Sequence, residues 1–237
     1  MTNTLLNYAA RGPVPVPAVR DVISDALWMT YRWMTLGLTT TGVVALLVAH
    51  SPAALSLLLE NRILFYALLL GQLGVVFALS ALASKVSTTV AALLFFGYAA
   101  LTGVTFSTLF LVYTSSSIAA TFFVTAGAFA GLSVVGLVTT HDLSAMGRFA
   151  LFALIGLILA SVVNIFLRSS GLDWLLTIGG VLIFAGLTAY DTQRLKELFR
   201  RGEATANLPL VGALTLYLDF INMFLFLLRI FGSRRRD

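Results

Sequence analysis

Seven long apolar segments, separated by short polar stretches, limit what this chain can fold into. They cover residues 33–49, 63–83, 88–112, 117–138, 148–168, 173–190 and 209–231. A helix of about 20 apolar residues crosses a hydrocarbon core of ~30 Å, and it satisfies its own backbone polar groups there. The segments therefore predict an all-α integral membrane protein with seven transmembrane helices.

The composition narrows the function classes. Charged residues are 11% of the chain, against roughly a quarter in soluble domains, and cysteine is absent. The lack of cysteine excludes disulfides, thiolate metal sites and cysteine nucleophiles. The net charge of +5 resides in loops and tails beside apolar segments, which is typical of topology signals and contact with anionic lipid. We therefore expect the lipid bilayer as a partner, and no nucleic acid.

The first 30 residues precede the apolar segments. They hold Arg11, Arg20 and three prolines before residue 18, and so do not predict a cleavable signal peptide. Apolar residues recur at helical spacing from Val19 to Tyr31, which predicts a short amphipathic interfacial helix running into the first span. A solvated leader, helical only in part, is the alternative. The expected organisation is a cytoplasmic leader over 1–30, a seven-helix transmembrane domain over 31–233 and a basic tail over 234–237.

Lysine and arginine positions predict the orientation. A cytoplasmic N-terminus places nine of them inside and six outside, which agrees with the positive-inside rule. If the last segment dipped into the membrane and returned, the distribution would be thirteen to two. However, residues 208–231 form a nearly unbroken apolar stretch that is long enough to cross. Seven crossings with the N-terminus inside are therefore the preferred topology.

Two aspartates lie where a membrane protein tolerates them least. Asp191 follows Tyr190 at the predicted end of the sixth span, and Asp219 lies about ten residues into the seventh. Asn222 is one turn further on the same helix face as Asp219. A carboxylate at membrane depth costs roughly 2.5–3.5 kcal/mol on insertion scales, so such residues usually mark function.

Pairing of the two aspartates is plausible because they belong to consecutive antiparallel segments. Asp219 lies ~15 Å deep if its helix enters the membrane at residue 209, and Asp191 is shallower. The depths match if the seventh helix begins outside the membrane. The alternative is that each carboxyl is satisfied separately, by backbone or by an asparagine.

A pair of carboxyls has definite chemistry. Two carboxylates a few Å apart cannot both ionise cheaply, so they share a proton, and its loss introduces repulsion between their helices. Lys85, at the cytoplasmic end of the second span, is the expected neighbouring cation. Two aspartates offer Ca²⁺ at most four of the six to eight oxygens it prefers, which suits transient binding by Asp191 and Asp219.

Catalytic signatures are missing. The chain has no HExxH, GxSxG or phosphate-loop motif. Intramembrane aspartyl proteases carry two such aspartates, but no glycine-rich stretch precedes Asp219, and no lysine for retinal lies in the last span. His141 and Asp142 could form a metal or proton site, although Asp142 as a helix cap is the preferred interpretation. We expect neither an enzyme nor a resident cofactor, with transient Ca²⁺ as the one candidate ion.

Residues 189–196 (AYDTQRLK) and 214–224 (LTLYLDFINMF) closely resemble the Bax inhibitor-1 family, in particular its bacterial inner-membrane members of the YbhL and YccA type. The resemblance extends over residues 27–233. It implies a bacterial inner-membrane protein whose last helix is central and wrapped by the other six. It also implies a pH-sensitive calcium leak with Asp191 and Asp219 as sensor and gate, and a basic latch at the position of Lys85. Tyr190, Gln193 and Asn222 are the expected supporting polar groups.

Two hypotheses of different classes follow. The first is a passive leak for cations, with calcium ions as the partner, gated by protonation of the aspartate pair. The second is a non-conducting regulator that binds other membrane proteins, such as a quality-control protease, through residues 1–30 or the basic tail.

Overall fold

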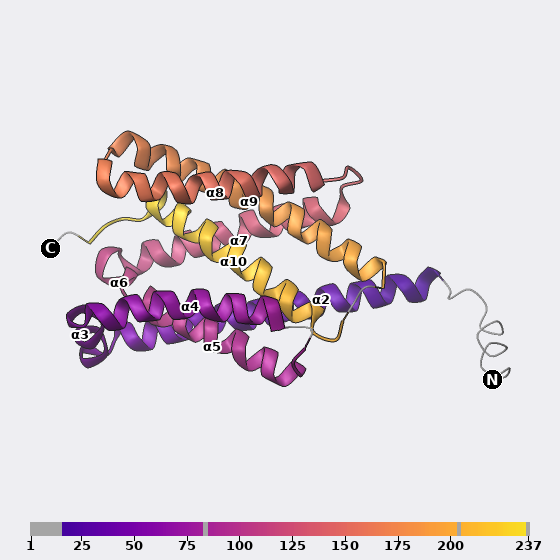
Figure 1. Cartoon of the computed structure of the whole chain (residues 1–237), viewed down its shortest axis with the longest axis horizontal. Helices are drawn as coiled ribbons and strands as arrows, with labels where there is room; N and C mark the ends of the chain where they lie inside the picture. Colours follow the sequence, from indigo (N-terminus) through magenta and orange to yellow (C-terminus); the bar gives the residue numbers. More distant parts are fainter. Residues whose placement is uncertain (1–15, 83–84, 203–204, 236–237) are drawn as a thin grey trace.

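The computed structural model of the chain describes residues 16–82, 85–202 and 205–235. Residues 1–15 of the expected leader (1–30) and residues 236–237 of the expected basic tail lie outside the described residues. The described part is built of helices (Figure 1): α2 (Val16–Ala49), α3 (Pro52–Glu60), α4 (Arg62–Leu82), α5 (Thr88–Phe106), α6 (Leu109–Val112), α7 (Ser115–Val138), α8 (Ser144–Leu167), α9 (Ser170–Arg200) and α10 (Leu208–Phe231). Seven of these are long and apolar enough to cross a membrane. The chain is an all-α, multi-pass membrane protein, as the apolar segments predict.

Serine and threonine side chains cap the N-termini of several helices. Ser51, Ser87, Thr114 and Ser169 each accept a hydrogen bond from a free backbone N–H in the first turn of α3, α5, α7 and α9. Such caps satisfy donors that a helix cannot pair internally. Among the sequential spans, α4 packs on α5, α8 packs on α9 and α9 packs on α10.

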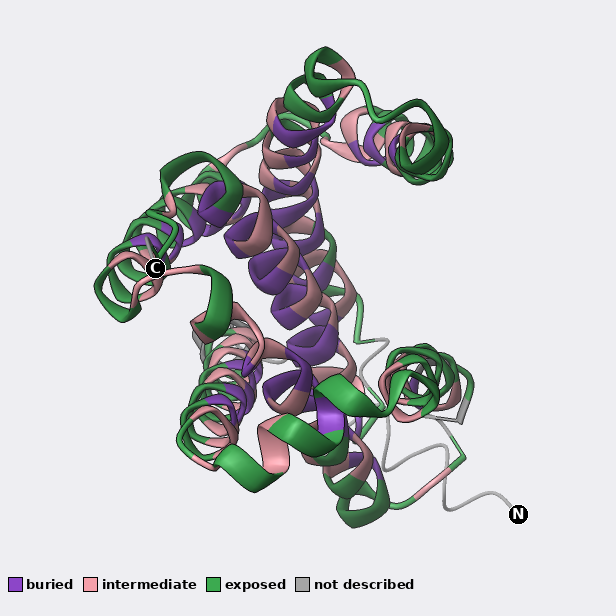
Figure 2. Ribbon diagram, turned by 90° about the vertical axis from the view of Figure 1, so that its left-hand side faces the viewer, coloured by how far each residue is buried: buried purple, intermediate pink, exposed green. Residues whose placement is uncertain are grey.

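Helix α10 is the centre of the bundle. In the most apolar part of α10, 67% of the residues are buried, against 6–39% in the other six spans. Figure 2 shows this buried helix between outer helices that are mostly exposed. Helices α2, α5, α7 and α9 pack directly on α10, whereas α4 packs on α5 and α8 packs on α9. The last helix is therefore central, as expected, but only four of the other six spans touch it closely.

The amphipathic segment and the first span form one continuous helix. Helix α2 runs from Val16 to Ala49 without a break at the expected boundary near residue 31. The additional short helix α3 fills the connection to α4. Helix α9 continues to Arg200, ten residues beyond the predicted end of the sixth span.

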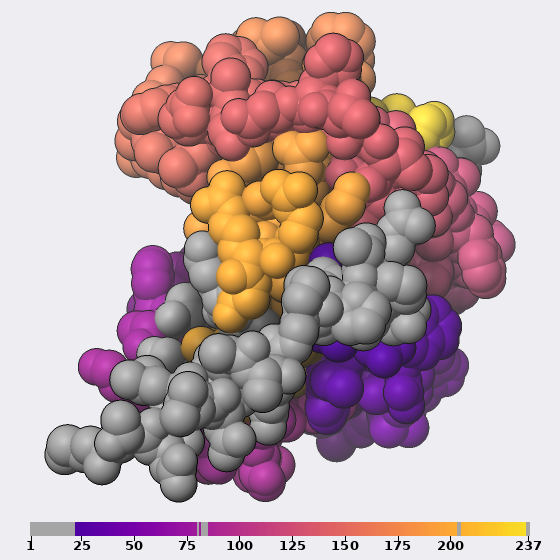
Figure 3. All heavy atoms as spheres, turned by 90° about the vertical axis from the view of Figure 1, so that its right-hand side faces the viewer, coloured from indigo at the N-terminus to yellow at the C-terminus, as the bar shows by residue number. Residues whose placement is uncertain are grey.

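The C-terminal segment lies at the end of the bundle opposite to the start of α2 (Figure 1). Arg234 forms an antiparallel bridge with Tyr113, and the N–H of Thr114 donates to the carbonyl of Ser233 at 3.0 Å. The last helix therefore crosses the whole bundle rather than returning to the side on which it began. Figure 3 looks onto the other end, where the end of α9 and the start of α10 appear in orange.

Candidate functional site

The side chains of Asp191 and Asp219 meet between α9 and α10. Asp191 is 9% exposed and Asp219 is 4% exposed, and their carboxyl groups are in hydrogen-bond contact. A hydrogen bond between two carboxyls requires a proton on one of them. The second oxygen of Asp219, Oδ2, is buried and has no hydrogen-bond partner within the described structure.

The two aspartates meet because α9 continues ten residues beyond the predicted end of the sixth span, whereas α10 begins where it was predicted to begin. Asp191 lies nine residues before the end of α9 and Asp219 eleven residues after the start of α10. At 1.5 Å per residue these positions are ~14 and ~17 Å from their helix ends, so they are level. The sixth span was predicted to end at residue 190, directly before Asp191, but the helix itself continues to Arg200. The sequence after it is polar, yet it continues the helix, and Leu195 and Phe199 are buried on one face.

Arg194 is the cation beside the pair. It lies one turn from Asp191 on the same helix, and its positive charge interacts electrostatically with the Asp191 carboxyl. Arg194 is exposed and forms no ion pair with any described residue.

Lys85, the expected latch, lies elsewhere. It is exposed, in the turn between α4 and α5, and forms no ion pair with a described residue. This turn is held at the start of α10, because Asn207 donates to the carbonyl of Val86 at 2.9 Å. Asp219 is twelve residues further along the helix, which is ~18 Å. A lysine side chain does not span that distance, so this structure does not bring Lys85 to the pair.

A groove with a volume of about 720 Å³ gives access to both aspartates. Helices α8, α9 and α10 line it, and its walls are mostly aliphatic and aromatic. It exists because α8 makes only marginal contact with α10 and rests on α9 instead. Asp191, Asp219 and Asn222 are polar groups on its inner side.

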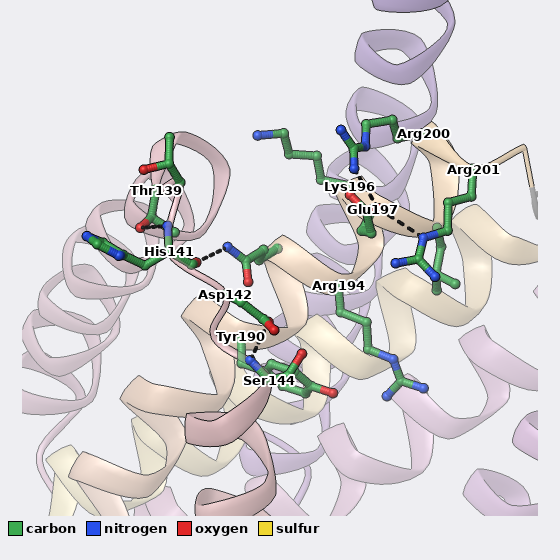
Figure 4. Close-up of a pocket in the computed structure, with 13 residues that line it drawn as sticks. Thr139, His141, Asp142, Ser144, Tyr190, Arg194, Lys196, Glu197, Arg200 and Arg201 are labelled. Carbon is green, nitrogen blue, oxygen red and sulfur yellow. Dashed lines mark hydrogen bonds and ion pairs between the residues drawn. The ribbon is translucent and has the colours of Figure 1, made fainter.

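A second cavity, of about 670 Å³, lies at the end of α9 beside the α7–α8 loop (Figure 4). We call it the vestibule. Its walls carry four basic and two acidic side chains: Arg194, Lys196, Arg200, Arg201, Asp142 and Glu197. Glu197 pairs with Arg200 and Arg201 at 2.8 and 2.9 Å, whereas Arg194 extends away from this cluster in Figure 4. Tyr190 and Arg194 line both the vestibule and the groove.

Comparison of the sequence with models of known protein families identifies the family of this chain. The model of the family described as "Inhibitor of apoptosis-promoting Bax1" matches residues 24–236. The chain belongs to the Bax inhibitor-1 family.

Relatives from several bacteria agree with this assignment. Inner membrane protein YbhL of Escherichia coli K12 is 51% identical over 210 residues, covering 86% of this chain and 90% of the relative. An uncharacterized protein of Deinococcus radiodurans is 48% identical, covering 90% and 93%. One of Borreliella burgdorferi is 45% identical, covering 86% and 90%. With its seven spans, this Bax inhibitor-1 family member is a multi-pass protein of the bacterial inner membrane.

The three expected supporting groups have structural contacts of their own. The amide of Gln193 accepts from the N–H of Leu143 and donates to the carbonyl of His141, each at 2.8 Å. Gln193 therefore holds the α7–α8 loop against α9. The ring of Tyr190 packs on the backbone of α8 at Gly147. Asn222 lines the groove and donates to the carbonyl of Leu218, one turn back in its own helix, at 2.8 Å.

The metal interpretation of His141 and Asp142 has no support in the described residues. No group of three or more metal-binding side chains occurs among them. The Asp142 carboxylate accepts from the N–H of Ser144 at 2.8 Å, at the first residue of α8. It therefore binds a free N–H at the helix start, as the cap interpretation expects, although the N-cap position itself belongs to Leu143.

Sequence reasoning did not single out a polar cluster on the opposite face of α10. The hydroxyl of Tyr217 lies 2.6 Å from that of Thr41, and Thr41 also donates to the carbonyl of Ala99 at 2.9 Å. Nearby, Thr102 donates to Gln72 at 3.4 Å. Tyr217 is fully buried. The signal was a tyrosine two residues from Asp219 in a mostly apolar helix.

Proposed function

We propose that this family member is a passive leak for cations, with Ca²⁺ foremost, gated by protonation of the Asp191–Asp219 pair. One observation carries the proposal. Two buried carboxyls are in hydrogen-bond contact between membrane-spanning helices, at the wall of a groove. Ionisable side chains inside membrane spans cost free energy, so those that are present usually serve a function.

The proton is the proposed switch. With one proton between them, the two carboxyls attract each other and hold α9 against α10. Once the proton is lost, two negative charges face each other in a poorly screened site and push the helices apart. A cation that enters then meets up to four carboxylate oxygens. The buried Oδ2 of Asp219, which lacks a partner in the described structure, is available to it.

The route beyond the pair is closed by packing. Phe184 of α9 and Phe226 of α10 stack at 6.0 Å between ring centroids, two turns further along α10 than Asp219. Phe226 also fills the space over Gly180, where a Cβ would lie 2.5 Å from the ring. This apolar contact separates the pair from the opposite side of the membrane. Separation of α9 and α10 is therefore what would open the route.

The experiment is calcium flux into proteoliposomes at a series of pH values between about 6 and 8, because two coupled carboxyls titrate as a unit and a pH series reports on the pair. Wild type, Asp191→Asn and Asp219→Asn are compared. Asp173→Asn is the matched control, because Asp173 lies on α9 but its side chain is 62% exposed. We expect pH-dependent flux in wild type and control, and a flattened response in both pair variants.

Two outcomes contradict the proposal. One is flux with an unchanged pH response in both pair variants. The other is folded wild type whose flux equals that of empty liposomes. The second outcome would leave the regulatory hypothesis, in which the protein binds another membrane protein, to be tested by co-purification.

A further inference from the structure

The groove between α8, α9 and α10 has the length and lining for one acyl chain. Its wall on α8 is a single apolar stripe at spacings of three or four residues, formed by Leu151, Leu154, Ile158, Val162 and Ile165. The stripe is ~21 Å long, longer than the ~15 Å half-thickness of the hydrocarbon core. Leu187 and Phe226 line the groove from α9 and α10.

Two arginines lie at the end of this groove near the α7–α8 loop. Arg148 is in the second turn of α8, Arg194 is in α9, and both line the groove. Both are exposed, and neither forms an ion pair with a described residue. Asp142 influences Arg148 only through its longer-range charge. Two exposed guanidinium groups that form no ion pair within the described structure are complementary to a phosphate, which arginine binds with paired N–H donors.

We propose that this groove is a binding site for an anionic phospholipid, with the phosphate on Arg148 and Arg194 and an acyl chain along the α8 stripe. A free phosphate would use the arginines alone and would gain nothing from the apolar wall. A zwitterionic lipid would use the wall but would add a positive group beside the arginines. The combination of wall and charge selects a lipid with net negative charge, such as phosphatidylglycerol.

The site has a consequence for the aspartate pair, which rests on the proposed function. Arg194 is the cation that acts on Asp191. A lipid phosphate on Arg194 places a negative charge within one turn of the pair and offsets the arginine. It also covers the positive end of the groove, at Arg148 and Arg194, which otherwise repels an approaching cation. Lipid occupancy is thereby coupled to the leak.

The test measures binding without flux. Full-length protein in detergent is titrated with phosphatidylglycerol or phosphatidylcholine, and retained lipid is counted by native mass spectrometry. The double variant Arg148→Gln/Arg194→Gln is compared with Arg62→Gln/Arg168→Gln, which loses the same charge at the other end of the bundle. We expect wild type and control to prefer phosphatidylglycerol. The groove variant should lose about thirtyfold in apparent affinity, because each basic group near an anionic surface contributes about fivefold.

A second variant tests the acyl chain. Ile158→Trp fills the exposed stripe and leaves both arginines in place, and we expect it to weaken phosphatidylglycerol binding in folded protein. Equal retention of the two lipids by wild type would overturn the proposal. Undiminished binding in the double variant, or inorganic phosphate that displaces phosphatidylglycerol completely, would overturn it as well.

Flux measurements keep the two proposals separate. If phosphatidylglycerol binds at the groove but no calcium flux occurs, the lipid site stands and the leak falls. If flux responds to pH in pure phosphatidylcholine and no variant changes lipid retention, the leak stands and the lipid site falls.

Discussion

Leu195 of α9 packs against the backbone of α10 at Gly212, one turn from Asp191 and two turns from Asp219. A Cβ at position 212 would lie 2.7 Å from Leu195 Cδ2 and 3.2 Å from Thr30 Cγ2. The missing side chain of Gly212 therefore sets how closely the two helices approach. This close approach is what brings the two carboxyls into contact.

A side chain at position 212 should destabilise the protein. We expect Gly212→Val to reduce the free energy of unfolding by about 1–3 kcal/mol, the usual cost of overpacking, and to lower the melting temperature in detergent. Gly127→Val is the control, because nothing lies within 4 Å of a Cβ at that position. Equal melting temperatures for the two variants would show that α9 and α10 separate without cost.

The hydroxyl of Tyr217 should stabilise the fold without contributing to the pH response. Tyr217→Phe keeps the ring contacts with Phe95 and Tyr98 and loses the 2.6 Å hydrogen bond to Thr41. We expect a loss of about 1 kcal/mol of stability, with Tyr66→Phe, at an exposed position, as the neutral control. Two residues correspond to ~200° around a helix, so Tyr217 faces away from the pair. A flattened pH response of flux in Tyr217→Phe would contradict this assignment.

The seven spans were predictable because the length and apolarity of a segment decide whether it crosses a membrane. The end of α9 was not, because residues 191–200 are rich in charge and resemble a loop. Their helical signal was the spacing of Leu195 and Phe199, four residues apart, which are both buried against the core. A polar stretch with one apolar stripe continues a helix beyond the membrane surface.

The candidate site was only partly predictable for a similar reason. Asp191 and Asp219 could be named because ionisable residues inside spans are rare. The position of Lys85 could not be predicted, since it depends on where the α4–α5 turn docks. That turn is fixed by Asn207, through its hydrogen bonds to Val86 and to Thr88, which are contacts between residues about 120 positions apart. Such contacts leave no local pattern in the sequence.

Gln193 should control the order of the α7–α8 loop. Its two hydrogen bonds, to His141 and Leu143, are lost in Gln193→Ala. We expect faster amide hydrogen exchange across residues 139–144, because the N–H of Leu143 loses its acceptor. Arg200→Ala, on the same helix, loses a hydrogen bond to Glu197 instead and should leave this exchange unchanged. Unaltered exchange in Gln193→Ala would mean that other contacts hold the loop.

Asp142 should not contribute to any pH response near neutrality. Hydrogen bonds from the side chain and backbone of Ser144 hold the pKa of the Asp142 carboxyl below its ordinary value of 3.8. A lowered folded-state pKa stabilises the fold above the ordinary value, and this is lost only as the pH falls through the folded-state pKa. Asp142 is therefore charged throughout the range of the flux assay. Asp142→Asn should leave the pH profile of calcium flux unchanged, and a shifted profile would place Asp142 in the switch.

Removal of the charge of Arg194 should shift the pH profile of flux, whereas removal of the charge of Lys85 should not. Arg194 acts on Asp191 directly, so Arg194→Gln removes the positive charge that favours loss of the shared proton. We expect flux to begin at a higher pH in this variant, measured in phosphatidylcholine liposomes so that lipid charge does not intervene. Lys85→Gln should leave the pH profile unchanged, because its turn is anchored ~18 Å along α10 from Asp219.

A larger shift for Lys85→Gln than for Arg194→Gln would show a second conformation in which the turn leaves Asn207 and the lysine reaches the pair. Flux in Asn207→Ala would then decide the matter, because freeing the turn should strengthen the effect of Lys85.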